Sequence, residues 1–214
     1  MTAVTVIGGS GYAGAHIVEA AAVRGLEVTS LSRGETAEQV AGVRYLRGSL
    51  LDAADRARAL DGADVVIAAV SPRGDMAGRV RPAIAALAAD AAEAGVRLGV
   101  IGGAGSLLQE PGGDLVMNGP DFPEEFKAEA REMGEVLDDL RAAPEALDWF
   151  FVSPAGSFGP WVAGEYRGEY RVGGDVLLVD ESGESAISGA DFGVAVVDEI
   201  EEPAHRRERF TVAY

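Results

Sequence analysis

The chain has 214 residues, the length of one generous domain, and 48% of them are apolar, which is enough for one sizeable core. Cysteine is absent, which excludes disulfides, thiolate nucleophiles and cysteine-ligated metals, and the two histidines are too few for a histidine-rich metal centre. A formal net charge of −17 disfavours nucleic acid and anionic membranes as partners. Because neither a signal peptide nor a long uninterrupted apolar run is found, the expected location is the cytoplasm.

Apolar runs alternate with helical patterns from the first residue, which is typical of βαβ units and a parallel sheet. The predicted strands are 3–7, 27–31, 43–46, 64–70, 96–101, 149–152 and 210–214. The predicted helices are 13–24, 52–60, 79–93, 123–141 and 190–200. The pattern therefore predicts an α/β fold in which residues 1–214 form one domain, a Rossmann-like doubly wound parallel sheet.

The rhythm changes beyond Pro154. Residues 166–172 and 176–179 are predicted to form two short strands of a hairpin, because Gly173-Gly174 stands between them. Region 155–188 is therefore predicted to be a small cap over the C-terminal edge of the sheet, where open α/β sheets bind their ligands.

A glycine-rich loop follows the first predicted strand and reads G-G-S-G-Y-A-G. In a dinucleotide-binding loop the first glycine permits a tight turn, the second lets pyrophosphate approach the backbone, and the third lets helix and strand pack closely. Such glycines also mark ordinary strand–helix turns, but the position in the first strand–turn–helix unit favours a cofactor. The residues expected to bind it are Gly8, Ser10, Gly11, Tyr12, Ala13 and Gly14.

The end of the second strand indicates which cofactor to expect. Sites for NAD place an acid there to hold the ribose 2′-hydroxyl, whereas this chain has Ser32 and Arg33, which suit a 2′-phosphate. We therefore expect NADP(H) to be preferred over NAD(H), although a solvated surface arginine is the simpler alternative for Arg33. Further cofactor contacts are expected at strand ends, from Ser49, Leu50, Ala68, Ala69, Val70, Gly102 and Gly103.

These motifs, with V-I-G-G-A-G-S-L at 100–107 and I-S-G-A-D-F-G-V-A-V-V-D-E-I-E at 187–201, resemble the atypical short-chain dehydrogenases/reductases. The likeness is to the NAD(P)H-binding group similar to biliverdin-IXβ (flavin) reductase and NmrA-like proteins, and it covers essentially the whole chain. It implies a Rossmann fold, NADP(H) binding and, in many members, reductase activity. The chain departs from this pattern at Ser49, where many relatives have aspartate, and it lacks the Tyr-x-x-x-Lys pair of classical members.

Two residues are candidates for catalysis. Ser106 follows the fifth strand, where short-chain reductases place a serine that binds the substrate carbonyl, although turn and cap serines are common. Lys127 is the only lysine in the chain and lies where the missing pair is expected, with Phe126 in place of a hydroxyl. Its alternative is a surface charge beside Glu124 or Arg131. Phe126, Phe158 and Trp161 are predicted to line a substrate pocket.

The leading hypothesis is an NADPH-dependent reductase that passes hydride directly to a planar or conjugated small molecule, such as a flavin, quinone or enone. Two alternatives stay open: a non-catalytic NADP(H)-binding sensor, and a redox-neutral isomerase, cyclase or dehydratase on the same fold. The expected partner is a small-molecule substrate, with a possible homodimer through helices 79–93 and 123–141.

Overall fold

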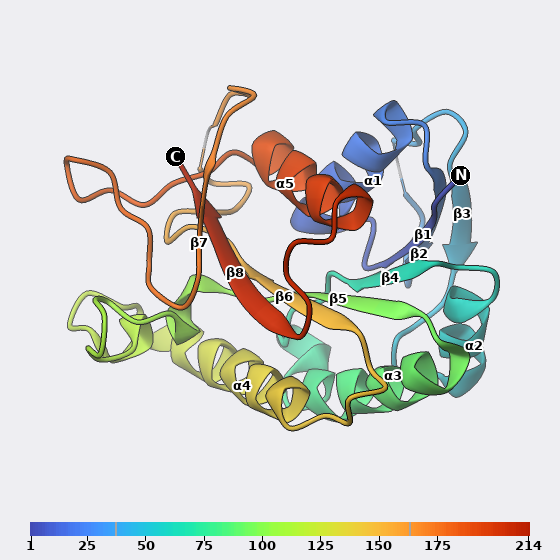
Figure 1. The fold of residues 1–214 in the computed structure, drawn as a ribbon, viewed down its shortest axis with the longest axis horizontal. Helices are drawn as coiled ribbons and strands as arrows, with labels where there is room; N and C mark the ends of the chain where they lie inside the picture. Colours follow the sequence, from blue (N-terminus) through green and yellow to red (C-terminus); the bar gives the residue numbers. More distant parts are fainter. Residues whose placement is uncertain (37, 163) are drawn as a thin grey trace.

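The computed structural model describes residues 1–36, 38–162 and 164–214 and confirms the predicted α/β class. One eight-stranded sheet has the order β3-β2-β1-β4-β5-β6-β8-β7, and all neighbours are parallel except β7 and β8 (Figure 1). The strands are β1 (Ala3–Ile7), β2 (Glu27–Ser32), β3 (Arg44–Arg47), β4 (Val65–Ala68), β5 (Arg97–Ile101), β6 (Trp149–Ser153), β7 (Arg171–Gly173) and β8 (Glu208–Ala213).

Helices cover both faces of the sheet, with α1 and α5 on one side and α2, α3 and α4 on the other (Figure 1). They are α1 (Tyr12–Val23), α2 (Ala53–Leu60), α3 (Val80–Ala94), α4 (Glu124–Arg141) and α5 (Gly189–Glu201), and the short 3-10 turns are η1 (Gly74–Met76), η2 (Ala104–Ser106) and η3 (Val116–Asn118). The central strands β4, β5 and β6 are buried throughout, as expected for a sheet covered on both faces.

Sequence order reverses between β1 and β4, which are neighbours at the centre of the sheet. The loops after β1 and β4 leave toward opposite faces at this point, and the crevice between them is the usual ligand site of a doubly wound sheet. The same edge carries the loops that follow β5 and β6. The architecture therefore brings together the residues after four strands that are far apart in sequence.

Helix ends follow local signals. The carboxylate of Asp52 caps α2 by accepting from the amides of Ala54 and Asp55, and α3 ends at Gly95 in the left-handed conformation with φ of 68°. Packing of α1 on α5 is close, because a Cβ on Gly193 would lie 2.4 Å from the carbonyl oxygen of His16. This contact fixes the helix that begins at the glycine loop against the C-terminal part of the chain.

The predicted hairpin of 166–172 and 176–179 is wrong. Only Arg171–Gly173 forms a strand, and it pairs antiparallel with β8 instead of with the residues after it. The following segment runs beside the loop after β5, where Leu108 donates to the carbonyl of Asp175 and Leu177 donates to the carbonyl of Leu108. The edge of β8 and the loop after β5 satisfy the backbone groups that an isolated hairpin would have paired with each other.

Candidate functional site

The glycine loop is held in its shape by close backbone contacts. Gly8 has φ of 88°, and a Cβ there would lie 2.2 Å from the carbonyl oxygen of Ala69 after β4. A Cβ on Gly14 would likewise lie 2.2 Å from the carbonyl oxygen of Gly8. Neither position therefore accommodates a side chain. The contacts bring the start of α1, the end of β1 and the end of β4 together at the point where strand order reverses.

The start of α1 leaves backbone donors available. The amides of the first helical turn have no intrahelical acceptor, and in the part of the chain that the structure describes no side chain caps this helix. Its first turn also contains no acidic residue, although the chain as a whole carries a net charge of −17. The loop and helix therefore fit a phosphate-containing ligand such as the pyrophosphate of a dinucleotide. Tyr12, Ala13 and Gly14 would supply the amides, because the amide of Gly11 already donates to the carbonyl of Gly8.

A hydrogen bond between Ser32 of β2 and Ser10 stabilises the glycine loop. The hydroxyl of Ser32 is almost buried, and its oxygen accepts a hydrogen bond of 3.0 Å from the amide of Ser10. This contact ties the glycine loop to the neighbouring strand. This hydrogen bond lets Ser32 position the loop, and its expected contact with the cofactor stays a prediction.

Arg33 lies at the predicted place and has an acidic partner that sequence reasoning missed. Its guanidinium contacts the carboxylate of Asp75 in the loop after β4, and both side chains are exposed. The Nε of Arg47, at the end of β3, donates to the carbonyl of Arg33 over 3.1 Å, so the guanidinium of Arg47 lies against the backbone of Arg33. The adjacent ends of β2 and β3 thus carry two arginines, of which Arg33 is paired across the site.

The other residues predicted to contact the cofactor near β2, β3 and β4 make most of their contacts within their own segments. The amide of Ser49 donates to Asp55, and the hydroxyl of Ser49 accepts from Leu51. The side chains of Leu50 and Ala68 are buried in the core. Only their backbone atoms are placed to contact a ligand, whereas Ala69 and Val70 are half-buried beside the glycine loop.

Gly102 and Gly103 follow β5 and differ in their surroundings. A Cβ on Gly102 would lie 2.1 Å from the ring of Phe151, so the residue is required for packing. A Cβ on Gly103 would meet no described atom within 4 Å. Gly103 therefore borders open space at the same edge as the glycine loop, where a ligand has room.

Phe126 and Trp161, two of the predicted pocket residues, meet around Arg73. The guanidinium carbon of Arg73 lies 5.1 Å from the ring centre of Phe126 and 5.9 Å from that of Trp161. Its Nε also pairs with Glu129 of α4. Trp161 is 63% exposed, which is unusual for so large an apolar side chain. Residues from three distant segments thus form one cationic and aromatic cluster at the ligand edge of the sheet.

Phe158, the third predicted pocket residue, does not join that cluster. Its ring lies 5.1 Å from the ring of Tyr12 and 4.6 Å from that of Phe192. It packs with the apolar core between α1 and α5. Tyr12 packs in the same group of rings, with its ring 5.0 Å from that of His16. Its side chain therefore fixes the start of α1.

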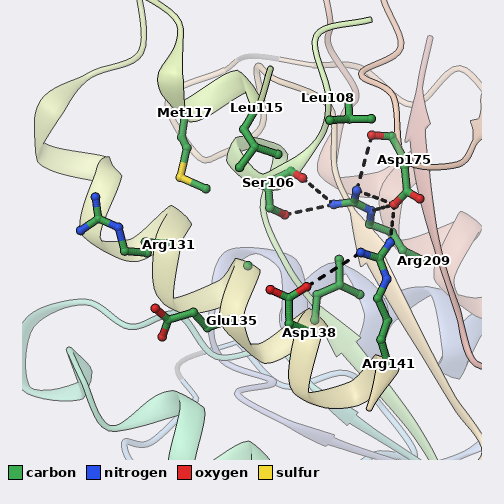
Figure 2. A pocket seen from close by; sticks show the side chains of 12 residues that line it. Ser106, Leu108, Leu115, Met117, Arg131, Glu135, Asp138, Arg141, Asp175 and Arg209 are labelled. Atoms are coloured by element: carbon green, nitrogen blue, oxygen red, sulfur yellow. Dashed lines mark hydrogen bonds and ion pairs between the residues drawn. The ribbon is translucent and has the colours of Figure 1, made fainter. Parts of the chain in front are cut away.

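Ser106 lines a separate cavity of about 310 Å³ between α4 and the loops after β5 and β7 (Figure 2). Nη1 of Arg209 donates to the carbonyl of Ser106 over 2.9 Å and to its hydroxyl over 3.1 Å. Arg209 is almost buried and also pairs with Asp175, which accepts from Arg141 as well. Ser106 therefore belongs to a polar network that joins the cap to β8.

Charge governs the pKa of Asp175 in this network. Partial burial acts to raise the pKa of its carboxyl, but the guanidinium groups of Arg209 and Arg141 outweigh burial and hold that pKa below its ordinary value. Burial lowers the pKa of Arg209, which its bond to Asp175 opposes. The carboxylate is thus needed in its charged form to balance a buried guanidinium.

Lys127 lies in the first part of α4, one position after Phe126. Its Nζ is 2.6 Å from a carboxylate oxygen of Glu124, which is largely exposed. The structure places no contact between Lys127 and Ser106 among the residues it describes, and the cavity around Ser106 is lined by other side chains. No hydrogen bond or ion pair therefore joins the two predicted catalytic residues in the described part of the chain, and the catalytic role of each stays a prediction.

Asp191 anchors the cap, and sequence reasoning missed it. Its carboxylate accepts from the amides of Arg167 and Gly168 at 2.9 Å, and from the hydroxyls of Ser188 and Tyr214. Burial acts to raise the pKa of this carboxyl, and the four hydrogen bonds together lower it. The spacing of Ser188 and Asp191 is that of a helix capping box, which is a signal that the sequence does contain.

A profile of the NAD(P)H-binding family matches residues 8–203. The Bacillus subtilis protein YwnB is 36% identical over 209 residues, which cover 97% of this chain and 96% of YwnB. SP1627 of Streptococcus pneumoniae, a proposed NADH-flavin reductase, is 35% identical with a TM-score of 0.83 over 100% of this chain and 99% of that chain. A proposed epimerase from Bacteroides thetaiotaomicron is 31% identical with a TM-score of 0.88 over 100% and 97% of the two chains. Within the described residues, no helix has the length and apolar character needed to span a membrane.

Proposed function

Since this chain belongs to the NAD(P)H-binding family, we propose that it is an NADPH-dependent reductase of a planar, conjugated small molecule. The observation that carries the proposal is the cluster of Arg73, Phe126 and Trp161, which lies at the same edge of the sheet as the glycine loop. Flat aromatic side chains and a guanidinium suit a flat acceptor whose reduction increases its negative charge. The likeness to SP1627, a proposed NADH-flavin reductase, supports a flavin-like acceptor.

The residues of the chain divide into two groups in this proposal. The amides of Tyr12, Ala13 and Gly14 hold the pyrophosphate, and Arg33 with Arg47 holds a ribose 2′-phosphate. When bound, the nicotinamide ring supplies a hydride. Phe126 and Trp161 orient the acceptor, while Arg73 and Lys127 stabilise negative charge on it.

The proposed reaction needs no acidic side chain. Pro123 stands four residues before Lys127, where the classical pair has tyrosine, and Phe126 beside Lys127 has no hydroxyl. The hydroxyl of Ser106 accepts from Arg209. A flavin or quinone tolerates an anionic reduced form, so water can supply the proton after hydride transfer. Simple ketones would require a positioned acid and are therefore expected to be poor acceptors.

The test is oxidation of NADPH by purified protein over a panel of flavins, quinones, enones and simple ketones. We expect turnover with at least one conjugated acceptor and little with the ketones. The Lys127→Ala variant should lower kcat with the preferred acceptor while the melting temperature changes little. Unchanged kcat in this variant would leave Lys127 as a surface charge paired with Glu124.

A second function, a non-catalytic NADP(H)-binding sensor, is favoured by one observation. Ser106, the expected partner of a substrate carbonyl, is engaged by a buried arginine. Tight NADPH binding without turnover on any acceptor of the panel would support the sensor and contradict the reductase.

A further inference from the structure

One ion pair crosses the entrance of the candidate site. Arg33 follows β2 and Asp75 lies in η1 after β4, and the guanidinium of the first contacts the carboxylate of the second. In the sheet, β1 lies between β2 and β4, and the glycine loop leaves from the end of β1. The pair therefore connects the two walls of the crevice above the loop, on the side where the adenosine of a dinucleotide is bound in this fold.

This pair contributes little to the stability of the fold. The side chains of Arg33 and Asp75 are 53% and 68% exposed, and exposed pairs of this kind are weak because water and salt screen them. A ligand with a stronger anionic group can therefore separate them. The pair joins two loops and lies outside the core. Its removal should therefore change ligand affinity more than the free energy of unfolding.

We propose that Asp75 is a specificity-determining residue that limits the preference of this chain for NADP(H). The proposal rests on the role of Arg33 given under the proposed function. A ribose 2′-phosphate must take Arg33 from Asp75, and it then lies near a carboxylate of like charge. A ribose 2′-hydroxyl is neutral and can donate to that carboxylate. Asp75 thus disfavours NADP(H) and favours NAD(H).

The position of Asp75 makes it a substitute for an acid that the chain lacks. Sites for NAD carry an aspartate or glutamate at the end of the second strand, where this chain has Ser32 and Arg33. From the loop after β4, the carboxylate of Asp75 contacts the guanidinium of Arg33, the residue that follows β2. Arg47, which contacts the carbonyl of Arg33, adds a second positive charge on that wall. The choice between the two coenzymes is thus set by opposing charges on the two walls.

The test compares the dissociation constants of NADP⁺ and NAD⁺, measured by titration calorimetry at fixed ionic strength, in the unmodified protein and in Asp75→Asn. We expect the ratio of the NAD⁺ constant to the NADP⁺ constant to rise about fivefold in the variant, which corresponds to one weak ion pair. Glu201→Gln is the matched control, because it also removes one carboxylate that pairs with an arginine, Arg24, but at the end of α5. Its ratio should stay at the wild-type value.

An unchanged ratio in Asp75→Asn would overturn the proposal, as would an equal change in Glu201→Gln. Arg33→Met separates this failure from a failure of the proposed function. If Arg33→Met abolishes the preference for NADP⁺ while Asp75→Asn has no effect, Arg33 binds the phosphate and Asp75 plays no part. If neither variant changes the ratio, the assignment of Arg33 is itself wrong.

Discussion

The two halves of the ligand edge are built from different kinds of atoms. On the nucleotide side, the site consists largely of backbone atoms of one continuous stretch, Gly8 to Gly14, fixed by contacts of glycine with carbonyl oxygens. On the acceptor side, it consists of side chains from distant segments, among them Arg73, Phe126 and Trp161. Local sequence specifies the first half directly, whereas the second exists only after the sheet, α4 and the cap have packed together.

The largest effect is expected on the nucleotide side, from Gly14→Ala. The added Cβ would lie 2.2 Å from the carbonyl oxygen of Gly8, so α1 must move away from the loop. We expect the dissociation constant for NADPH to rise about a hundredfold, since overpacking of this kind costs about 1–3 kcal/mol. Calorimetric titration measures it.

Gly174→Ala is the matched control for that substitution. A Cβ there would meet no described atom within 4 Å, and its backbone has no positive φ that would disfavour alanine. Its affinity for NADPH should equal that of the wild type. Equal affinities in Gly14→Ala and Gly174→Ala would mean that the loop is not the pyrophosphate site.

The next largest effect is a loss of stability caused by a substitution on the acceptor side. Asp175→Asn removes the carboxylate partner of the buried Arg209 and of Arg141. Because a buried guanidinium is left without its counter-charge, we expect the free energy of unfolding to fall by about 2 kcal/mol. The dissociation constant for NADPH should not change, since the network lies beside α4 and the cap. Urea unfolding and titration of the same variant check both parts, and a large loss of NADPH affinity would contradict the separation of the two halves.

The pH dependence of stability follows from the same carboxylate. Its pKa is held below the ordinary value in the folded protein, so its contribution is complete above the pKa of an unfolded aspartate, about 4. The contribution is lost as the pH falls through the lower, folded-state pKa. We expect the melting temperature to decrease on acidification below about pH 4, and to decrease less in Asp175→Asn. Parallel curves for the two proteins would show that Asp175 is not one of the responsible groups.

A smaller effect is expected from Trp161→Ala, which tests the acceptor cluster. The side chain is mostly exposed, so its removal should leave the melting temperature nearly unchanged. Loss of stacking should raise KM for the conjugated acceptor about fivefold, while KM for NADPH stays the same. Steady-state kinetics with each substrate varied in turn measure this, and Tyr166→Ala, which removes another exposed aromatic side chain of the cap, is the control. Equal KM values in Trp161→Ala and the wild type would remove Trp161 from the site.

The features that could be predicted from the sequence are those that depend on residues close together along the chain. Apolar periodicity was sufficient for the order of strands and helices, and glycine spacing was sufficient for the loop at Gly8 to Gly14. The hairpin prediction failed because Gly173-Gly174 is a local turn signal, while the edge of β8 offered the preceding strand a partner far along the chain. Local signals have no information about such an edge.

The side-chain contacts of the site could be predicted only in part. Arg73 and Asp75 were missed because, in a loop with Pro72 and Gly74, charged residues look like solvated surface groups. Their partners, Phe126 on α4 and Arg33 after β2, are brought near only when the chain has folded. Phe158 has the same residue type as Phe126, yet its ring packs against those of Tyr12 and Phe192, a contact between distant segments that residue type does not predict.

The smallest effect, and the one that best separates the two halves, is expected from Ser106→Ala. If the hydroxyl serves only to accept from Arg209, its removal leaves the carbonyl bond in place and costs about 1 kcal/mol of stability. The kcat for a conjugated acceptor should then stay within about twofold of the wild type, because less than about 0.4 kcal/mol of the barrier depends on it. Ser106→Thr, which keeps the hydroxyl, should recover part of the stability. A fall in kcat of about a hundredfold without a change in NADPH affinity would instead place Ser106 in contact with substrate, and the network around Arg209 would then be part of the reacting site.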